Sequence, residues 1–575
     1  MSDSGFIRGL CMGRIEEDQL IPFRSMAETE RETVAAVAES IDDLLGSRGE
    51  DFRAWDRAGE LPPGFLDELK EFGLFSLIIP EEDGGLGFGA TAYSRTLQQL
   101  SRHDASVAVT IGAHSSIGMR GLLLFGTDEQ KARYLPSLAT GEMIAAFCLT
   151  EPGAGSDAAS LRTTAERDGE GWVLNGSKLW ITNGGIAQFF TVFAKTGLAD
   201  ERRGMSAFIV RSDQEGVSVG PHEDKMGLRA SSTTSVFFDN VRLEPDALLG
   251  EEHKGFKIAM KILNSGRTGL GGGCVGAMKK LIEQATRQAG EREQFGRPIS
   301  EFGLVKQKLG QMVIDCYASE SVVNAVNGLI DGGVDDYAVE AAISKIFASE
   351  ALWRSADEAL QIAGGNGYMC EYSYERTVRD CRVNRIFEGT NEVLRLFVAL
   401  TAMRDVGNEL RELQTSLRGV FDDPIKGFGV FGGYARKRAS LAGLGSRGWT
   451  KLVPEVASPA AGFEDATRHL GVAVDRILRK HGKNIIGKQF ASKRLADIMI
   501  DLFVLAAVLS RVSTAISETS AEACATELQI LRAFSGQALE RVKGNFAHID
   551  LNDDDLIKAL ADDALAVNGY RWDNL

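Results

Sequence analysis

The hydrophobic periodicity of the chain changes at Met143 and again at Gly255, and these two changes limit what the chain can fold into. Before Met143, apolar residues recur at helical spacing, for example over residues 29–45. Between the two positions, short alternating apolar runs are separated by Asn-Gly, Gly-Gly and Asp-Asn turns, a pattern typical of strands. Long helical periods return after Gly255 and continue to about Ala402. We therefore expect an α+β fold in which a β-barrel or sandwich stands between helical regions.

A chain of 575 residues is too long for a single core, so several domains are expected. The helical segments after Gly255 predict an antiparallel four-helix bundle. A glycine-rich, basic stretch follows this bundle, and helical periodicity resumes near Phe463. The predicted domains are an N-terminal α domain (1–142), a middle β domain (143–253), a catalytic α-helical bundle (254–403), a glycine-rich basic linker (404–460) and an additional C-terminal α domain (461–575).

Three local expectations follow from the same patterns. Residues 74–80 are expected to form a short extended piece. Residues 171–175 and 179–182 are expected to be separate strands, and residues 255–264 and 268–292 separate helices.

The composition excludes several classes of protein. A net charge of −16 opposes nucleic-acid binding, which usually needs a basic surface. The 7 cysteines are scattered without a Cys-x-x-Cys pair, as in a protein whose thiols stay reduced, and the 7 histidines show no metal-ligand spacing, so we expect no metal site. The N-terminus lacks a signal-peptide run and carries acids from Asp3 onward, unlike a mitochondrial presequence. We expect a cytoplasmic protein of bacterial type, and the longest apolar run, residues 498–509, is too short to span a bilayer.

Two glycine patterns resemble the dinucleotide fingerprint Gly-x-Gly-x-x-Gly. The first runs from Gly271 to Gly276 and follows a predicted helix, whereas the second, from Gly153 to Ala158, leads into further strands. The fingerprint requires a strand before the glycines and a helix after them. We therefore predict no Rossmann domain and expect the first glycine run to serve close helix packing.

The stretch around Glu388 has the composition of a general-base site. Its carboxylate stands between Phe387, which can keep water away, and Gly389, which lets a ligand approach the backbone. A carboxylate in a dry pocket has a raised pKa, which suits removal of a proton from carbon. Thr390 or Asn391 is placed to cap the apolar helix that follows. The alternative for this stretch alone is a surface glutamate in a loop before a helix.

A loop and a strand in the middle region offer a surface for a planar cofactor. The loop from Thr150 to Ser156 has small residues and free backbone N–H groups. Trp180 and Thr182 are two residues apart on a predicted strand, so both would face the same side and offer an aromatic wall beside a hydroxyl. The alternative is a tryptophan in the core of a sandwich.

Three positions in the helical regions carry donors for an anionic ligand. Arg267 lies among small residues in a helical run and needs a partner, which Glu388 or a ligand would supply. Arg292 at one helix end and the glycine nest after Gln361 at another could receive phosphate. The alternatives there are ordinary charge pairing at a helix C-terminus and a Schellman stop.

Five motifs follow one another along the chain and are specific as a set. They are Phe147-Cys-Leu-Thr-Glu-Pro-Gly-Ala-Gly-Ser-Asp157, Lys178-Leu-Trp-Ile-Thr-Asn183, Arg292-Glu-Gln-Phe-Gly296, Gln361-Ile-Ala-Gly-Gly-Asn-Gly367 and Ile386-Phe-Glu-Gly-Thr390. With them, the chain resembles the acyl-CoA dehydrogenase family from Phe6 to about Ala402, which implies an α, a β and an α domain. The C-terminal region, with Gly482-Lys-Asn-Ile-Ile and Lys493-Arg-Leu-Ala-Asp, resembles the very-long-chain branch, which has an extra helical domain.

The resemblance implies an FAD-dependent enzyme that desaturates long-chain acyl-CoA thioesters between Cα and Cβ in fatty-acid β-oxidation. Glu388 occupies the position of the catalytic base in most of the family, and Gly266 stands where the isovaleryl and long-chain branches place theirs, just before Arg267. Glu388 would take the α-proton while the β-hydride passes to flavin N5. The base's own backbone N–H and a flavin ribityl hydroxyl would stabilise the enolate oxygen, and electron-transferring flavoprotein would accept the electrons.

The same resemblance assigns binding residues by position. Phe147 and Phe387 replace tyrosines of medium-chain relatives, so any hydroxyl contact there is lost. The expected FAD contacts, some of them across a dimer interface, are Phe147, Leu149, Thr150, Gly155, Ser156, Trp180, Thr182, Arg292, Gln294, Phe295, Gln361, Gly364, Gly365, Thr390 and Glu392. The expected acyl-CoA contacts are Ser156, Asn264, Arg267, Phe387, Gly389, Gly112 and Ala113.

Chain length, assembly and alternative functions are also implied by the resemblance. Gly112 and Ala113 replace a larger acidic side chain of medium-chain relatives, which predicts room for a long acyl tail; the alternative is helix packing by small residues. The extra helical domain predicts a homodimer, because it can cover the face through which family tetramers pair. Two other functions remain: a non-catalytic assembly or binding protein on the same fold, and an acyl-CoA oxidase.

Residues 424–453 differ in charge from the rest of the chain. They include Lys426, Arg436, Arg447 and other cations, contain no acid, and are interleaved with aromatic residues. This mixture suits an anionic lipid surface, and the very-long-chain relatives attach to a membrane through the matching region. We expect peripheral contact with the inner face of the membrane; the alternative is a basic linker that lies on the acidic body of the protein.

Overall fold

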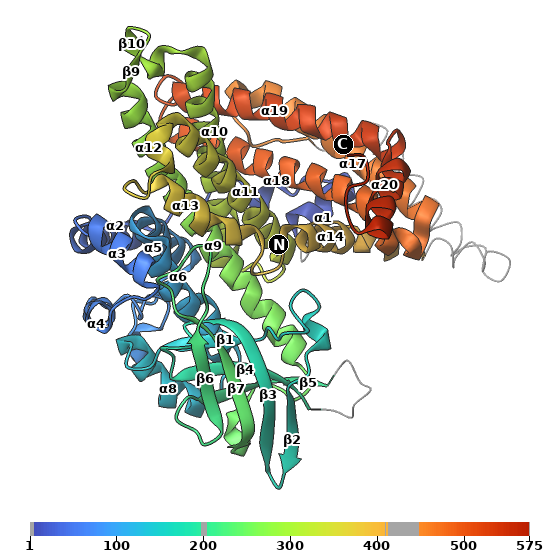
Figure 1. Ribbon diagram of the computed structural model, residues 1–575. Coiled ribbons are helices and arrows are strands. Elements are labelled where there is room, and N and C mark those ends of the chain that lie inside the picture. The colour runs from blue at the N-terminus through green and yellow to red at the C-terminus, as the bar shows by residue number, and fades with distance from the viewer. Residues whose placement is uncertain (1–4, 197–203, 409, 412–447, 574–575) are drawn as a thin grey trace, which may run out of the picture. The chain divides into compact units, whose positions relative to one another are not determined.

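Two compact units make up the computed structural model, which describes residues 5–196, 204–408, 410–411 and 448–573 (Figure 1). The larger unit is Phe23–Asn391, and the other joins the described residues before Phe23 to those after Asn391. The sequence placed residues 1–22 in the N-terminal α domain. That prediction was wrong for residues 5–22, because their apolar side chains pack with the C-terminal helices.

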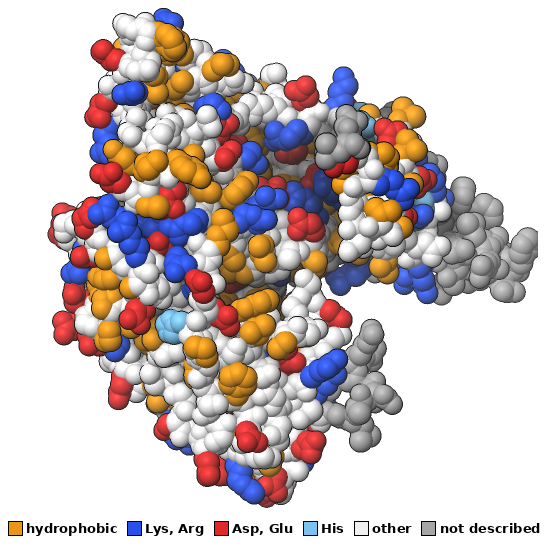
Figure 2. Space-filling view, viewed as in Figure 1, with side chains coloured by type: hydrophobic (Ala, Val, Ile, Leu, Met, Phe, Trp, Pro, Cys, Tyr) orange, Lys and Arg blue, Asp and Glu red, His pale blue; other side chains and the backbone are white. Residues whose placement is uncertain are grey.

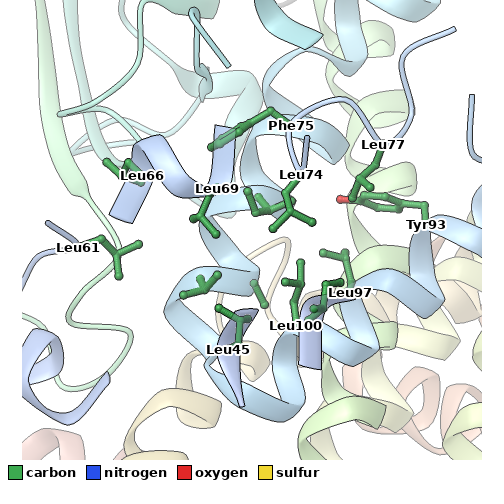
Figure 3. Close-up of a cluster of buried hydrophobic side chains, with 14 of the residues drawn as sticks. Leu45, Leu61, Leu66, Leu69, Leu74, Phe75, Leu77, Tyr93, Leu97 and Leu100 are labelled. Atoms are coloured by element: carbon green, nitrogen blue, oxygen red, sulfur yellow. The ribbon is translucent and has the colours of Figure 1, made fainter. Parts of the chain in front are cut away.

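Helices with buried leucines form the first part of the larger unit. Leu45, Leu69, Phe75 and Leu97 lie together in its core (Figure 3). Residues 74–80, expected to be extended, form turns instead, because their apolar side chains enter this core. The elements are α2 (Glu28–Leu45), α3 (Gly49–Ala58), α4 (Pro63–Glu71), α5 (Ala90–His103), α6 (Ala105–Gly112), the π-helical segment η3 (Ala113–Gly118), α7 (Arg120–Phe125) and α8 (Asp128–Thr140).

One apolar stretch in this part is long enough to cross a membrane. Within the described residues, Ala105–Phe125 alone meets that criterion of length and hydropathy, and 67% of its apolar window is buried inside the protein. Burial of this degree is the behaviour of a core helix.

The middle part of the larger unit is a mixed sheet of eight strands. Its order is β6-β7-β3-β2-β4-β5-β8, and β1 pairs in parallel with β4. The two strands expected at residues 171–182 are one strand, because a bulge between Lys178 and Ile181 keeps it paired with β7. The strands are β1 (Ala145–Cys148), β2 (Thr164–Asp168), β3 (Gly171–Thr182), β4 (Phe189–Lys195), β5 (Met205–Arg211), β6 (Val217–His222), β7 (Thr233–Leu243) and β8 (Leu248–Leu249).

Long helices form the last part of the larger unit. They are α9 (Gly255–Glu291), α10 (Gly303–Asp331), α11 (Ala338–Ala363), the short α12 (Gly365–Tyr368) and α13 (Tyr374–Cys381). The two helices expected in residues 255–292 are the single helix α9. Its glycines serve close packing on α5, as predicted: a Cβ at Gly276 would lie 2.0 Å from the Gln98 carbonyl oxygen.

The second unit is helical and includes the N-terminus. Phe6 in α1 is fully buried and lies 5.8 Å from the ring of Phe503. Residues 498–509 form the middle of its central helix, where Asp501 pairs with Arg541 at 2.6 Å. The helices are α1 (Phe6–Cys11), α14 (Asn391–Ala402), α17 (Ala457–His481), α18 (Gln489–Glu518), α19 (Ala525–Asp550) and α20 (Asp554–Val567).

Most of the expected membrane segment, residues 424–447, lies outside the described residues. Its last residues are described and contact protein. The Trp449 ring lies 5.4 Å from that of Phe463 and 6.4 Å from that of Phe6, and Lys451 pairs with Asp18. Trp449 and Lys451 are therefore not free lipid-facing groups in this structure.

Candidate active site

Glu388 lies on a tight turn just before α14. Its φ of 55° is in the left-handed region, which is uncommon for a residue with a side chain, and Gly389 follows with φ 90°. The Oε2 atom is buried and has no hydrogen-bond partner among the described residues. Burial raises the pKa of Glu388 to about 7, although the cationic side chains of Arg267 and Lys345 oppose the rise. A buried carboxylate with this pKa can accept a proton near neutral pH.

Helix α9 approaches this carboxylate through a glycine. A Cβ at Gly266 would lie 2.6 Å from Glu388 Oε2, so any side chain there would displace the carboxylate. Arg267, the next residue, directs Nε toward the Glu388 carbonyl oxygen at 3.4 Å and donates from a terminal nitrogen to Asn264 Oδ1 at 2.7 Å. The structure thus brings together Glu388, Asn264 and Arg267, three of the residues named from the sequence.

Helix α11 contributes a residue that the sequence reasoning missed. Lys345 is fully buried, and its Nζ donates to the Gly389 carbonyl oxygen at 2.9 Å and to Asn391 Oδ1 at 2.8 Å. Asn391 therefore bonds to α11 through its side chain. A cap of α14 by Thr390 or Asn391 stays a prediction. A signal for Lys345 exists in the sequence, because it is a lone lysine within the apolar helical run Ala-Ala-Ile-Ser-Lys-Ile-Phe-Ala.

Small residues of α6 and η3 also lie against α9. A Cβ at Gly112 would lie 3.9 Å from Leu97 and 4.0 Å from the Tyr93 hydroxyl, an ordinary contact distance. Close helix packing therefore does not impose glycine at this position, in contrast to Gly276. Ala113 is buried at the start of η3. Both residues remain predicted contacts for an acyl tail.

The loop from Leu149 to Ser156 is held by a buried ion pair. Lys178 Nζ donates to Glu151 Oε1 at 2.7 Å and to the Phe193 carbonyl oxygen at 2.8 Å. Burial acts to raise the pKa of Glu151, but Lys178 and the hydrogen bonds from Thr163 and Arg162 hold it below its usual value. The loop glycines beyond this anchor are open, since no atom lies within 4 Å of a Cβ built at Gly155.

Trp180 stands on the open face of β3 beside this loop. It is 62% exposed with φ 57°, Thr182 is half-buried, and Ile181 between them is buried. The core-tryptophan alternative is thereby wrong, because the core position belongs to Ile181. An open glycine loop and an exposed aromatic wall fit a planar flavin. Phe147, Leu149, Thr150, Gly155, Ser156, Trp180 and Thr182 remain its predicted contacts.

Three further predicted flavin contacts lie far from Glu388 within one chain. Arg292, Gln294 and Phe295 belong to the hairpin of β9 (Glu293–Gln294) and β10 (Arg297–Pro298) after α9. The hairpin stands at the end of α9 away from the sheet (Figure 1), about 40 Å along the helix from Gly266. Hydrophobic side chains are exposed around this tip (Figure 2), and Phe295 is 94% exposed.

Gln361, Gly364 and Gly365 are exposed at the C-terminal end of α11, where Gly364 has φ 60°. Thr390 is half-buried beside Gly389, and Glu392 is exposed at the start of α14. The assignment of these residues and of the hairpin to the FAD phosphates and adenosine stays a prediction.

Comparisons with known proteins agree with this architecture. The chain matches models described as acyl-CoA dehydrogenase, N-terminal domain (residues 28–142), middle domain (146–241) and C-terminal domain (253–403), and ACAD9/ACADV, C-terminal domain (454–570). The very long-chain specific acyl-CoA dehydrogenase, mitochondrial, of Homo sapiens is 44% identical over 526 residues, which cover 89% of this chain and 79% of the human protein.

Two solved structures are also similar. An acyl-CoA dehydrogenase complexed with FAD from Bacillus anthracis has a TM-score of 0.81 and 32% identity, covering 96% of this chain and 94% of that chain. A chain described as electron transferring flavoprotein of Acidaminococcus fermentans has a TM-score of 0.63 and 35% identity, covering 65% of this chain and 98% of that chain.

The fold, the open flavin surface and the buried carboxylate define the class of FAD-dependent dehydrogenases. The chain belongs to the acyl-CoA dehydrogenase family and carries the additional C-terminal domain of its ACAD9/ACADV group.

Proposed function

We propose that the enzyme oxidises long-chain and very-long-chain acyl-CoA thioesters to trans-2-enoyl-CoA, with Glu388 as the base that removes the α-proton. The buried, unpartnered Oε2 of Glu388 on its strained turn carries this proposal. FAD, when bound, supplies the acceptor for the β-hydride. Gly266 leaves the carboxylate room to turn toward a substrate carbon, and burial keeps bulk water away from it.

The charge that develops on the thioester oxygen needs donors in the same site. By analogy with the family, we assign this role to the backbone N–H of Glu388. The left-handed backbone at Glu388 and Gly389 fixes the direction of that N–H, and contacts from Arg267 and Lys345 to the two carbonyl groups hold it. Asn264 keeps the Arg267 guanidinium in place.

Preference for a long acyl chain is the finer part of the proposal. It is supported by Gly112, where close packing does not require glycine, and by similarity to the human very-long-chain relative. Each buried methylene contributes about 0.8 kcal/mol, so room for a long tail is worth several kcal/mol of binding.

Electron-transferring flavoprotein is the proposed acceptor of the electrons, in line with the similar chain described as electron transferring flavoprotein of Acidaminococcus fermentans. A homodimer is the proposed assembly, since the hairpin that carries Phe295 is exposed at its tip and distant from Glu388. Sedimentation of the purified protein tests the dimer.

A cytoplasmic location with contact to the inner face of the membrane through residues 424–453 is proposed from the sequence alone.

The test of the function is anaerobic reduction of the purified flavoprotein by acyl-CoA. We expect palmitoyl-CoA to bleach the flavin, with kcat/KM higher than for butyryl-CoA. Re-oxidation by electron-transferring flavoprotein but not by oxygen identifies a dehydrogenase, and fast re-oxidation by oxygen identifies an oxidase. Flavin that no acyl-CoA reduces would contradict the proposal.

A further inference from the structure

Lys345 ties the Glu388 turn to helix α11. Its Nζ donates to the Gly389 carbonyl oxygen at 2.9 Å and to Asn391 Oδ1 at 2.8 Å. The Asn391 amide in turn donates to Ser349 Oγ at 3.0 Å and to Glu350 Oε1 at 3.1 Å. Three groups on neighbouring turns of one helix therefore hold the backbone on the C-terminal side of Glu388.

The titratable groups that face Glu388 come from three helices, and two of these groups are cations. Arg267 approaches from α9, Lys345 from α11 and the Tyr93 hydroxyl from α5. Lys345 itself also faces Cys274 and Glu350. The two hydrogen-bond acceptors of Lys345 are a carbonyl and an amide, both neutral, so neither cancels the ammonium charge. In a buried site, such a charge acts on a nearby carboxylate much more strongly than it would in water.

We propose that Lys345 is a positioning residue for the base: it fixes the backbone at Gly389, and its charge favours the ionised form of the Glu388 carboxylate. The inference rests on the proposed function, in which Glu388 accepts the α-proton. Arg267 anchors the carbonyl of Glu388 and Lys345 that of Gly389, so the two cations hold consecutive peptide groups.

The charge has a direct consequence for protonation. Burial raises the pKa of Glu388 to about 7 even with both cations present. Burial also lowers the pKa of Lys345 to about 8, although the Glu388 carboxylate opposes that fall. Loss of the ammonium removes one of the two cations that stabilise the carboxylate, so the pKa of Glu388 rises further and less of the base is ionised at neutral pH.

The test compares Lys345→Met, which keeps the length of the side chain without charge or donors, with Lys345→Arg, which keeps the charge. The infrared band of the Glu388 carboxylic acid, identified by its loss in Glu388→Gln, is titrated in each flavin-loaded protein. We expect the midpoint in Lys345→Met to rise by about one pH unit or more, and that in Lys345→Arg to stay near wild type. The acid limb of the kcat/KM profile should shift by the same amount. Relative to wild type, kcat/KM of Lys345→Met should be about tenfold lower near pH 6.5 and should recover near pH 9.

Ser349→Ala is the matched control, because it removes one hydrogen bond to Asn391 without changing charge. It should lower activity at every pH and leave the midpoint in place. A Lys345→Met protein with lowered activity at every pH and an unshifted midpoint would overturn the proposal. If that variant does not fold, Lys345→Gln carries the same test. A wild-type flavin that acyl-CoA fails to reduce would refute the proposed function instead, while the infrared titration would still decide the effect of the charge.

Discussion

At the scale of single residues, the site depends on a carboxylate that the fold keeps partly protonated. Glu388 has a strained φ, a buried oxygen without a partner, and a pKa of about 7 against an ordinary value of 4.5. Because the folded pKa lies above the unfolded one, the carboxyl stabilises the fold fully below about pH 4.5, and this stability is lost as pH rises through about 7. The base therefore costs stability under the conditions in which it works.

Replacement of this group should stabilise the protein in one pH range only. We expect Glu388→Gln to raise the thermal midpoint at pH 8, because the ionised, buried carboxylate lowers the free energy of unfolding there by at most about 3 kcal/mol. Near pH 4.5 the variant should change the thermal midpoint little. The same variant should retain FAD and lose α-proton exchange. Calorimetry at both pH values measures the difference, with Glu71→Gln as the exposed control. Equal shifts at both pH values would show that the effect is not electrostatic.

The sequence predicted part of this residue-scale arrangement. Glu388 and Gly389 were found because a short motif carries them, and Arg267 because it lies among small residues in a helical run. The three residues lie together in the structure. Lys345 lies on another helix 43 positions before Glu388, and only folding brings it to Gly389. Side chains joined by tertiary contact leave no local pattern, so a lone lysine in an apolar run was the only sign.

At the scale of elements, one buried ion pair anchors the proposed flavin loop to the sheet. Lys178 on β3 bonds to Glu151 in the loop and to the Phe193 carbonyl on β4. Both side chains are almost completely buried, so the pair is desolvated and neither charge has water as a substitute partner. The ion pair therefore fixes the loop at Glu151, while the part of the loop near Gly155 stays open.

Breaking this pair should affect both stability and cofactor retention. Lys178→Met leaves Glu151 charged and unpaired, and we expect a loss of about 3 to 5 kcal/mol in the free energy of unfolding together with weaker FAD binding. Denaturant unfolding and flavin content after gel filtration measure the two effects. The Lys178→Met, Glu151→Gln double variant should recover part of the lost free energy of unfolding, because it contains no unpaired buried charge at this site. A double variant no more stable than the single one would contradict the role of the charge.

Periodicity predicted elements well where apolar residues mark one face. Helix α10 (Gly303–Asp331) lies within the region where long helical periods were expected. Strands β2 and β6 have weak sequence signals. Most residues of both strands are exposed, β2 is mainly polar, and Gly220 and Pro221 interrupt β6. The break expected near Gly266 does not exist, since packing of α9 against its neighbours overrides the weak helix propensity of glycine.

At the scale of the whole molecule, the expected membrane contact rests on the basic residues 424–453, of which the structure describes only 448–453. Residues 448–453 pack within the second unit through Trp449 and Lys451. The cations proposed to contact lipid are therefore those that precede residue 448. Those cations are Lys426, Arg436, Lys437, Arg438 and Arg447.

We expect the protein to float with anionic vesicles at low salt, and deletion of residues 427–447 to abolish flotation. Each cation near such a surface contributes about 1 kcal/mol, so replacing the five cations with glutamine should weaken binding strongly and salt should weaken wild-type binding. Trp449→Phe is the control, because its ring packs on Phe463 and should not matter for lipid. Flotation that persists after the deletion would assign membrane contact to another surface.

The N-terminal segment gives the molecule a timing problem during synthesis. Phe6, Ile7 and Leu10 are fully buried, and the Leu20 carbonyl accepts a hydrogen bond from Ser510, 490 positions further along. A ribosome adds about 5 to 20 residues per second, so these first apolar residues wait about 25 to 100 s for their partners to emerge. Throughout that interval these apolar side chains are exposed on the nascent chain. The second unit therefore completes its core only after residues 490 positions apart have both been synthesised, so its closure follows the synthesis of most of the chain.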